Sequence, residues 1–73
     1  STRATIIDPQ GNRYDGDVNA FMATGYGALR MANGELFEGE FKSNRRHGLG
    51  IATAPDGKKT FGRWENGDHK GLD

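Results

Sequence analysis

Glycine recurs along this chain at a fixed interval of 23 residues, and this interval restricts the fold more than any other feature. The clearest column is Gly16, Gly39 and Gly62, with the same spacing at each step. Further columns keep that spacing: Gly11 with Gly34 and Gly57, Gly25 with Gly48 and Gly71, and Gly27 with Gly50. Self-similarity at a period of roughly 20 to 50 residues is the signature of repeat architectures. We therefore expect an array of short, similar units.

Large side chains follow the same register and indicate β-strands. Tyr14 aligns with Phe37, and Val18 aligns with Phe41 and Trp64. In residues 37–41, aromatic residues and a glycine alternate with two glutamates, which is the period-2 pattern of a strand with two unlike faces. Helix is not expected, because no window has apolar residues at helical spacing and glycine interrupts every candidate.

Turn signals divide the repeat into β-hairpins. Asn33-Gly34 and Asp56-Gly57 are expected to be two-residue turns, since both residue types tolerate positive φ. The strands before them are expected to be short, and residues 19–24 and 42–47 are expected to be longer turns at the opposite end. The predicted fold is all-β: a single twisted antiparallel sheet, a meander of about six strands without helices.

The pattern resembles the MORN (membrane occupation and recognition nexus) repeat family. Its motifs are matched by Phe37-Glu38-Gly39-Glu40-Phe41, His47-Gly48-Leu49-Gly50 and Asp56-Gly57. On this register we divide the chain into a partial repeat at 1–13, whole repeats at 14–36 and 37–59, and a partial repeat at 60–73. The resemblance implies hairpins joined into one elongated sheet. Thr60 and Val18 depart from the family pattern, because each stands where an aromatic residue belongs.

Composition excludes several classes of function. The chain has 10 Lys and Arg residues and 10 Asp and Glu residues, so its formal net charge is zero. This does not fit a nucleic-acid-binding protein. The chain has no cysteine and no grouped ligands, so neither a metal site nor a cofactor is expected. His47 and His69 lack a positioned nucleophile or acid, so we do not expect an enzyme. The sequence shows no membrane-length apolar run and no signal peptide, which favours an intracellular protein, with removal of a targeting segment as the alternative.

Two apolar features predict a surface that binds another protein. The first is a row of rings, in which each ring covers a glycine that lacks a Cβ atom. The second is the turn containing Phe21 and Met22, because turns are normally polar; partner contact and folding back onto the rings both remain open. Unpaired sheet edges also favour pairing with another copy of the chain, giving a homo-oligomer. The predicted partner-binding residues are Tyr14, Phe21, Met22, Phe37, Phe41 and Trp64.

A basic cluster supports a second candidate function. Four basic groups fall within six residues: Lys42, Arg45, Arg46 and His47. Such a cluster can hold anionic lipid headgroups, and a simply solvated turn is the alternative. The main hypothesis is a non-catalytic module for protein–protein interaction or scaffolding, within a larger protein or an oligomer. The alternatives are a module that targets anionic phospholipid membranes and, by the resemblance, a regulatory appendage of an enzyme.

Overall fold

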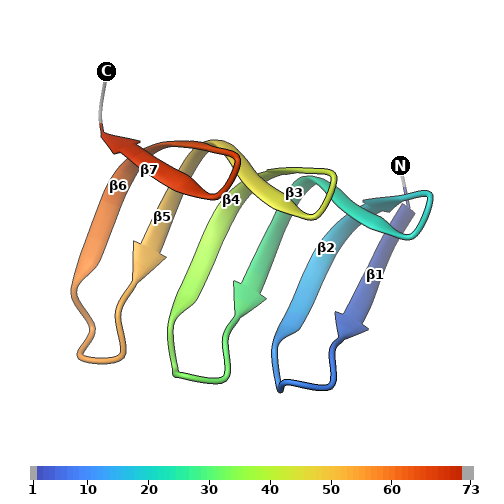
Figure 1. Cartoon of the computed structure of the whole chain (residues 1–73), viewed down its shortest axis with the longest axis horizontal. Coiled ribbons are helices and arrows are strands. Elements are labelled where there is room, and N and C mark those ends of the chain that lie inside the picture. The colour runs from blue at the N-terminus through green and yellow to red at the C-terminus, as the bar shows by residue number, and fades with distance from the viewer. Residues whose placement is uncertain (1, 72–73) are drawn as a thin grey trace.

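The computed structural model describes residues 2–71 as one open antiparallel sheet of seven strands, whose spatial order is the order in the chain (Figure 1). The strands are β1 (Thr2–Ile7), β2 (Arg13–Asn19), β3 (Met22–Arg30), β4 (Leu36–Lys42), β5 (Arg45–Thr53), β6 (Lys59–Glu65) and β7 (Asp68–Gly71). The predicted meander is confirmed, and the described residues contain no helix. The sheet has seven strands where about six were expected, and the last strand, β7, is only four residues long.

The two classes of turn were assigned to the wrong ends of the hairpins. The two turns expected to be long are two-residue turns with positive φ at both central residues, Ala20-Phe21 and Ser43-Asn44, and Asn66-Gly67 is a third turn of the same kind. Positive φ at both positions is the geometry of type I′ hairpin turns. Consequently β3 and β5 begin at Met22 and Arg45, inside the segments 19–24 and 42–47 that were expected to be turns.

The turns expected to have two residues are longer. The amide of Gly34 donates to the carbonyl of Met31 at 3.0 Å, and the amide of Met31 donates to Glu35 at 2.8 Å. Only the glycine of the Asn33-Gly34 pair has positive φ, at 95°. This is a three-residue loop made of a turn followed by a left-handed glycine, and the loops after β1 and β5 repeat it. An Asn-Gly pair fits both loop types, so the pair alone does not determine the loop length.

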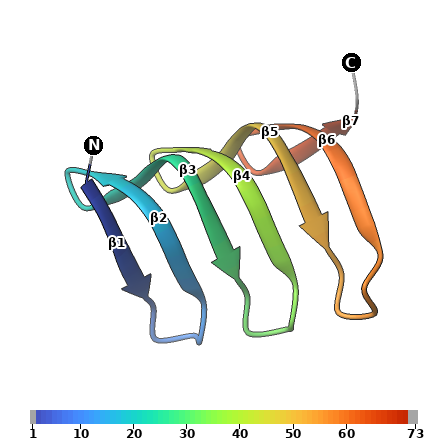
Figure 2. The same ribbon diagram turned by 180° about the vertical axis from the view of Figure 1, so that it is seen from behind.

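The strands bend where one side of the hairpin carries extra residues. The register shifts between Gly16 and Val18 in β2, and again between Gly39 and Phe41 in β4. Opposite these shifts, Gly25 and Gly48 have φ of 83° and 110°, a conformation that favours glycine. Such bulges bend a strand and increase its twist. Figures 1 and 2 show the result: the two-residue turns curl back at one side of the sheet, and the longer loops lie at the other.

Successive curled turns contact one another. The amide of Asn44 donates to the carbonyl of Ala23 at 3.0 Å, and the Asn44 side chain accepts a bond from the Ala23 amide at 2.8 Å. One repeat later, the amide of Gly67 donates to Arg46 at 3.0 Å. The same contact therefore recurs at the interval found in the sequence. Each turn is held by the turn of the next repeat.

The core is a row of rings on one face of the sheet, which we call the ring face. Tyr14, Phe37, Phe41 and Trp64 are each at most 5% exposed. Their centroids are 4.9 Å apart for Tyr14 and Phe41, 5.3 Å for Phe41 and Phe37, and 4.8 Å for Phe37 and Trp64. The predicted continuous row is confirmed, with Val18 as a half-buried neighbour. Burial of each ring contributes roughly 1.5–3 kcal/mol.

Glycine makes this burial possible. A Cβ atom on Gly27 would overlap the ring of Tyr14, and one on Gly50 would overlap the ring of Phe37. Both of these rings therefore lie flat on the backbone of the neighbouring strand. Thr60 has no ring to do the same, and here His69 replaces it: its Nε2 lies 2.7 Å from where a Cβ atom of Gly62 would be. The imidazole centroid is 4.6 Å from that of Trp64, which extends the row to β7.

Candidate interaction surfaces

The four rings predicted to bind a partner lie inside the fold. Phe37 is fully buried, and Tyr14, Phe41 and Trp64 are nearly so. The Tyr14 hydroxyl donates to the Asp17 carbonyl at 2.7 Å. Burial, with the nearby Asp17 carboxylate, raises the pKa of Tyr14, so the phenol remains a donor. A surface available to a partner must therefore come from other side chains.

The Phe21–Met22 turn is at the surface, in an unusual backbone conformation. Phe21 is 97% exposed and has a φ of 64°, and its neighbour Ala20 has a φ of 52°. Met22 is 37% exposed. The residues one and two repeats later, Asn44 and Gly67, are types that adopt positive φ at low cost, whereas phenylalanine is not. Phe21 thus differs from its counterparts in both chemistry and backbone strain.

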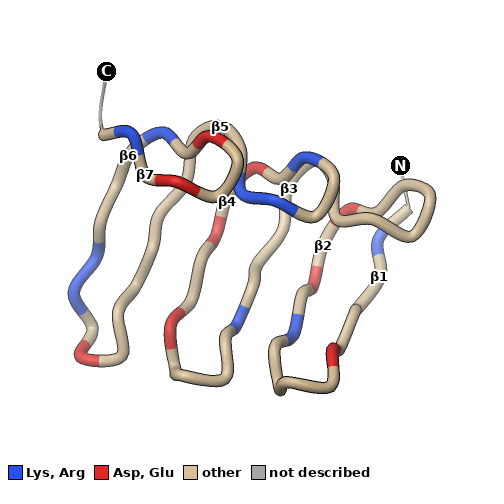
Figure 3. Tube along the Cα trace, viewed as in Figure 1, with Lys and Arg blue, Asp and Glu red and all other residues tan. Residues whose placement is uncertain are grey.

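The basic cluster is divided between the two sides of the sheet. Lys42 and Arg45 are direct cross-strand partners and both are exposed, beside the turn between β4 and β5 (Figure 3). Arg46 lies on the ring face, with its guanidinium carbon 5.8 Å from the centroid of Phe37. It donates from Nη2 to the Gly67 carbonyl at 3.1 Å. His47 is half-buried, and its Nδ1 atom has no hydrogen-bond partner among the described residues.

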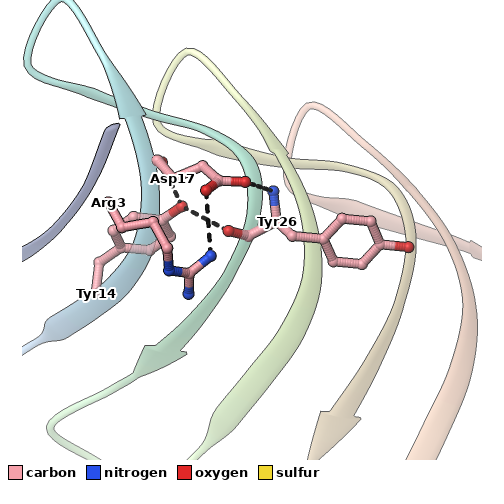
Figure 4. Close-up of polar contacts among 4 residues, drawn as sticks. All are labelled: Arg3, Tyr14, Asp17 and Tyr26. Atoms are coloured by element: carbon pink, nitrogen blue, oxygen red, sulfur yellow. Dashed lines mark hydrogen bonds and ion pairs between the residues drawn. The ribbon is translucent and has the colours of Figure 1, made fainter. Parts of the chain in front are cut away.

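Carboxylates on the side opposite the rings, which we call the rear face, hold the bulges together. Asp17 accepts a bond from the Tyr26 amide at 3.0 Å and an ion pair from Arg3 at 3.1 Å (Figure 4). Glu40 accepts the equivalent bond from the Leu49 amide at 2.8 Å. Each carboxylate thus replaces a ladder bond that the bulge removes. The alternation in residues 37–41 places Glu40 opposite the rings but does not indicate this role.

The rear face also exposes large apolar side chains that sequence reasoning did not select. Tyr26 is 61% exposed, Leu49 56% and Phe61 58%. They border a hollow of about 350 Å³, whose other lining residues are Glu38, Gly39, Gly50, Ile51 and Gly62. Figure 4 shows the Tyr26 ring projecting away from Asp17 and across the next strand. Alternation predicts that these residues lie on the rear face, because each is next to a glycine that a ring covers on the other face, but it does not predict that they meet at one site.

The described residues lack a preformed metal-binding cluster. They contain no group of three or more His, Cys, Asp or Glu side chains placed to hold a metal ion. In residues 2–71 no helix is long and apolar enough to cross a membrane. The exposed side chains described above offer apolar contacts together with a few charged groups.

One segment of the chain is similar to a known protein family. Residues 37–59 match the family model of the MORN repeat. This match covers the second whole repeat, with the ring-bearing strand β4, the bulge and the three-residue loop. No curated protein matches the chain.

Proposed function

Because residues 37–59 are a MORN repeat, a module generally involved in protein or membrane interactions, we propose that this chain is a non-catalytic module that binds another protein through its Phe21–Met22 turn. The observation that carries the proposal is the 97% exposure of Phe21 at a φ of 64°. An exposed phenyl group contributes nothing to the core. A left-handed conformation costs roughly 1–2 kcal/mol for a residue with a Cβ atom.

Backbone strain that does not stabilise the fold is typical of functional positions. The next repeat forms the same turn with Asn44, which also bonds to Ala23 through its side chain. The first turn therefore has no polar residue in the place of Asn44, and it exposes an aromatic and a thioether side chain instead. Aromatic residues and methionine are enriched in the buried centres of protein interfaces.

Photo-crosslinking tests this role directly. We would place p-benzoylphenylalanine at Phe21 in the full protein in its own cells, with the same substitution at Asn44 as the matched control turn. The expected result is a discrete protein adduct from position 21, which Met22→Ser reduces and which position 44 does not give. Equal crosslinking from both turns, or none from position 21, would refute the role of this turn.

The bound protein can also be a second copy of the chain, because the outer edges of β1 and β7 are unpaired in the sheet. Sedimentation equilibrium over a hundredfold concentration range separates the two cases. A monomer at every concentration rules out self-pairing and leaves a different protein as the partner.

The exposed pair Lys42 and Arg45 supports a second candidate, contact with an anionic membrane surface. Each contributes about 1 kcal/mol near such a surface. Co-sedimentation with vesicles containing anionic phospholipid should fall in Lys42→Glu/Arg45→Glu. It should be unchanged in Lys58→Glu/Lys59→Glu, two exposed cations at the opposite end of the sheet. Equal loss in both variants would show nonspecific charge attraction.

A further inference from the structure

The hollow on the rear face has features of a second binding site. Its rim is formed by exposed Tyr26, Leu49 and Phe61, which come from three different strands. Its floor includes the backbone of Gly39, Gly50 and Gly62, a row of direct cross-strand partners. Most soluble proteins expose apolar side chains singly, so a group of three around one hollow indicates an interaction site.

Charge identifies the kind of group that fits. Glu38 is the one charged residue among those described as lining the hollow. Nearby carboxylates on the same face already have partners, since Asp15 pairs with Arg13 and Asp17 with Arg3. No ion pair involves Glu38 within residues 2–71. A carboxylate in a hollow that two aromatic side chains also border attracts a cation, which the ring faces can also stabilise.

We infer that the rear hollow binds a short segment of a partner protein in which one arginine or lysine is flanked by apolar side chains. The cation would lie against Glu38 between Tyr26 and Phe61, and the apolar neighbours would cover Leu49. An anionic membrane surface does not fit here, because Glu38 would repel its headgroups. The inference rests on the proposed protein-binding function but uses a different surface from the Phe21–Met22 turn.

Selection from a random library of 12-residue peptides displayed on phage tests the inference without a known partner. The wild-type chain is the target, and three variants serve for counter-selection. Glu38→Gln removes the charge with no change of shape. Leu49→Ser/Phe61→Ser removes the apolar rim at exposed positions. Glu65→Gln is the control, an exposed carboxylate that does not line the hollow. Circular dichroism confirms that each variant keeps the sheet.

The selected peptides are expected to share an arginine or lysine with apolar residues on both sides. Because hydrogen bonds to charged groups are strong, Glu38→Gln should weaken their binding about tenfold or more, and Glu65→Gln should not change it. The rim variant should abolish binding.

Three results of the peptide selection overturn the inference. They are selection of no peptide, selection of peptides without a cation, and binding that none of the rear-face variants affects. In the last case, a loss of binding in Phe21→Ser would leave the proposed function standing with the turn as its site. Concentration-dependent dimers that Leu49→Ser/Phe61→Ser dissolves would likewise overturn it, by showing that a second copy covers the hollow.

Discussion

Replacing Ala20 by Asn and Phe21 by Gly is expected to stabilise the fold while removing the proposed contact with a partner. These two residues form a type I′ turn with φ of 52° and 64°. The third turn of the same kind, Asn66-Gly67, already carries the residue pair that the geometry favours. The double variant copies that pair into the first turn.

The size of the effect follows from the backbone. Left-handed geometry costs roughly 1–2 kcal/mol for a residue with a Cβ atom, and Asn and Gly avoid most of that cost. Glycine also makes the unfolded chain more flexible, which offsets roughly 0.5–1 kcal/mol of the gain in folding stability. Phe21 is 97% exposed, so its loss removes almost no burial. Because two residues are replaced, the net gain is at least about 1 kcal/mol, which raises the Tm of a domain of this size by about 4–8 °C or more.

Thermal unfolding followed by circular dichroism measures the gain, and the crosslinking or binding assay measures the loss of contact. Ala32→Asn is the matched control, because Ala32 itself does not have positive φ and should not gain stability. An unchanged or lower Tm in the double variant would refute the claim that this turn is strained.

Three further predictions test the contacts that hold the sheet. Phe41→Ala should cost roughly 3 kcal/mol and leave the chain largely unfolded at room temperature, as seen by loss of near-ultraviolet dichroism. Glu40→Ala should cost about 1–2 kcal/mol in urea unfolding, because it leaves the Leu49 amide without its acceptor, whereas Glu38→Ala should cost less than about 0.5 kcal/mol. The pKa of Asp8 lies below its usual 3.8 because the loop that follows donates hydrogen bonds to it. Its contribution to stability is therefore complete above that value and lost as the pH falls further, and Asp8→Asn should flatten this part of the pH profile.

The core was predictable because a repeat makes its own register visible. Because the glycine and aromatic columns share one spacing, a ring in each repeat can contact the equivalent glycine of the neighbouring strand. The Phe37–Gly50 contact is of this kind. A single helix or strand would not have offered this internal check. The row of rings and the meander follow from these columns.

The parts that were not predictable depend on geometry that alternation does not encode. Glu38 and Glu40 have the same spacing from the rings, yet only Glu40 lies opposite a bulge and accepts the Leu49 amide. Asn33-Gly34 fits two loop lengths, and the loop formed depends on where the neighbouring strands stop pairing. The rear hollow was missed because Tyr26 and Phe61 belong to different strands, and only the register of the sheet brings them to one site.

The central claim is that this single-layer sheet uses one set of aromatic side chains as its core and presents another set for binding. Photochemically induced nuclear polarisation tests it most directly, because the method reports which tyrosine and tryptophan rings a dissolved dye can reach. The chain has two tyrosines and one tryptophan, so each signal can be assigned. We expect strong polarisation of Tyr26 and none of Tyr14 or Trp64. Polarisation of Trp64 or Tyr14 comparable to that of Tyr26 would contradict the claim.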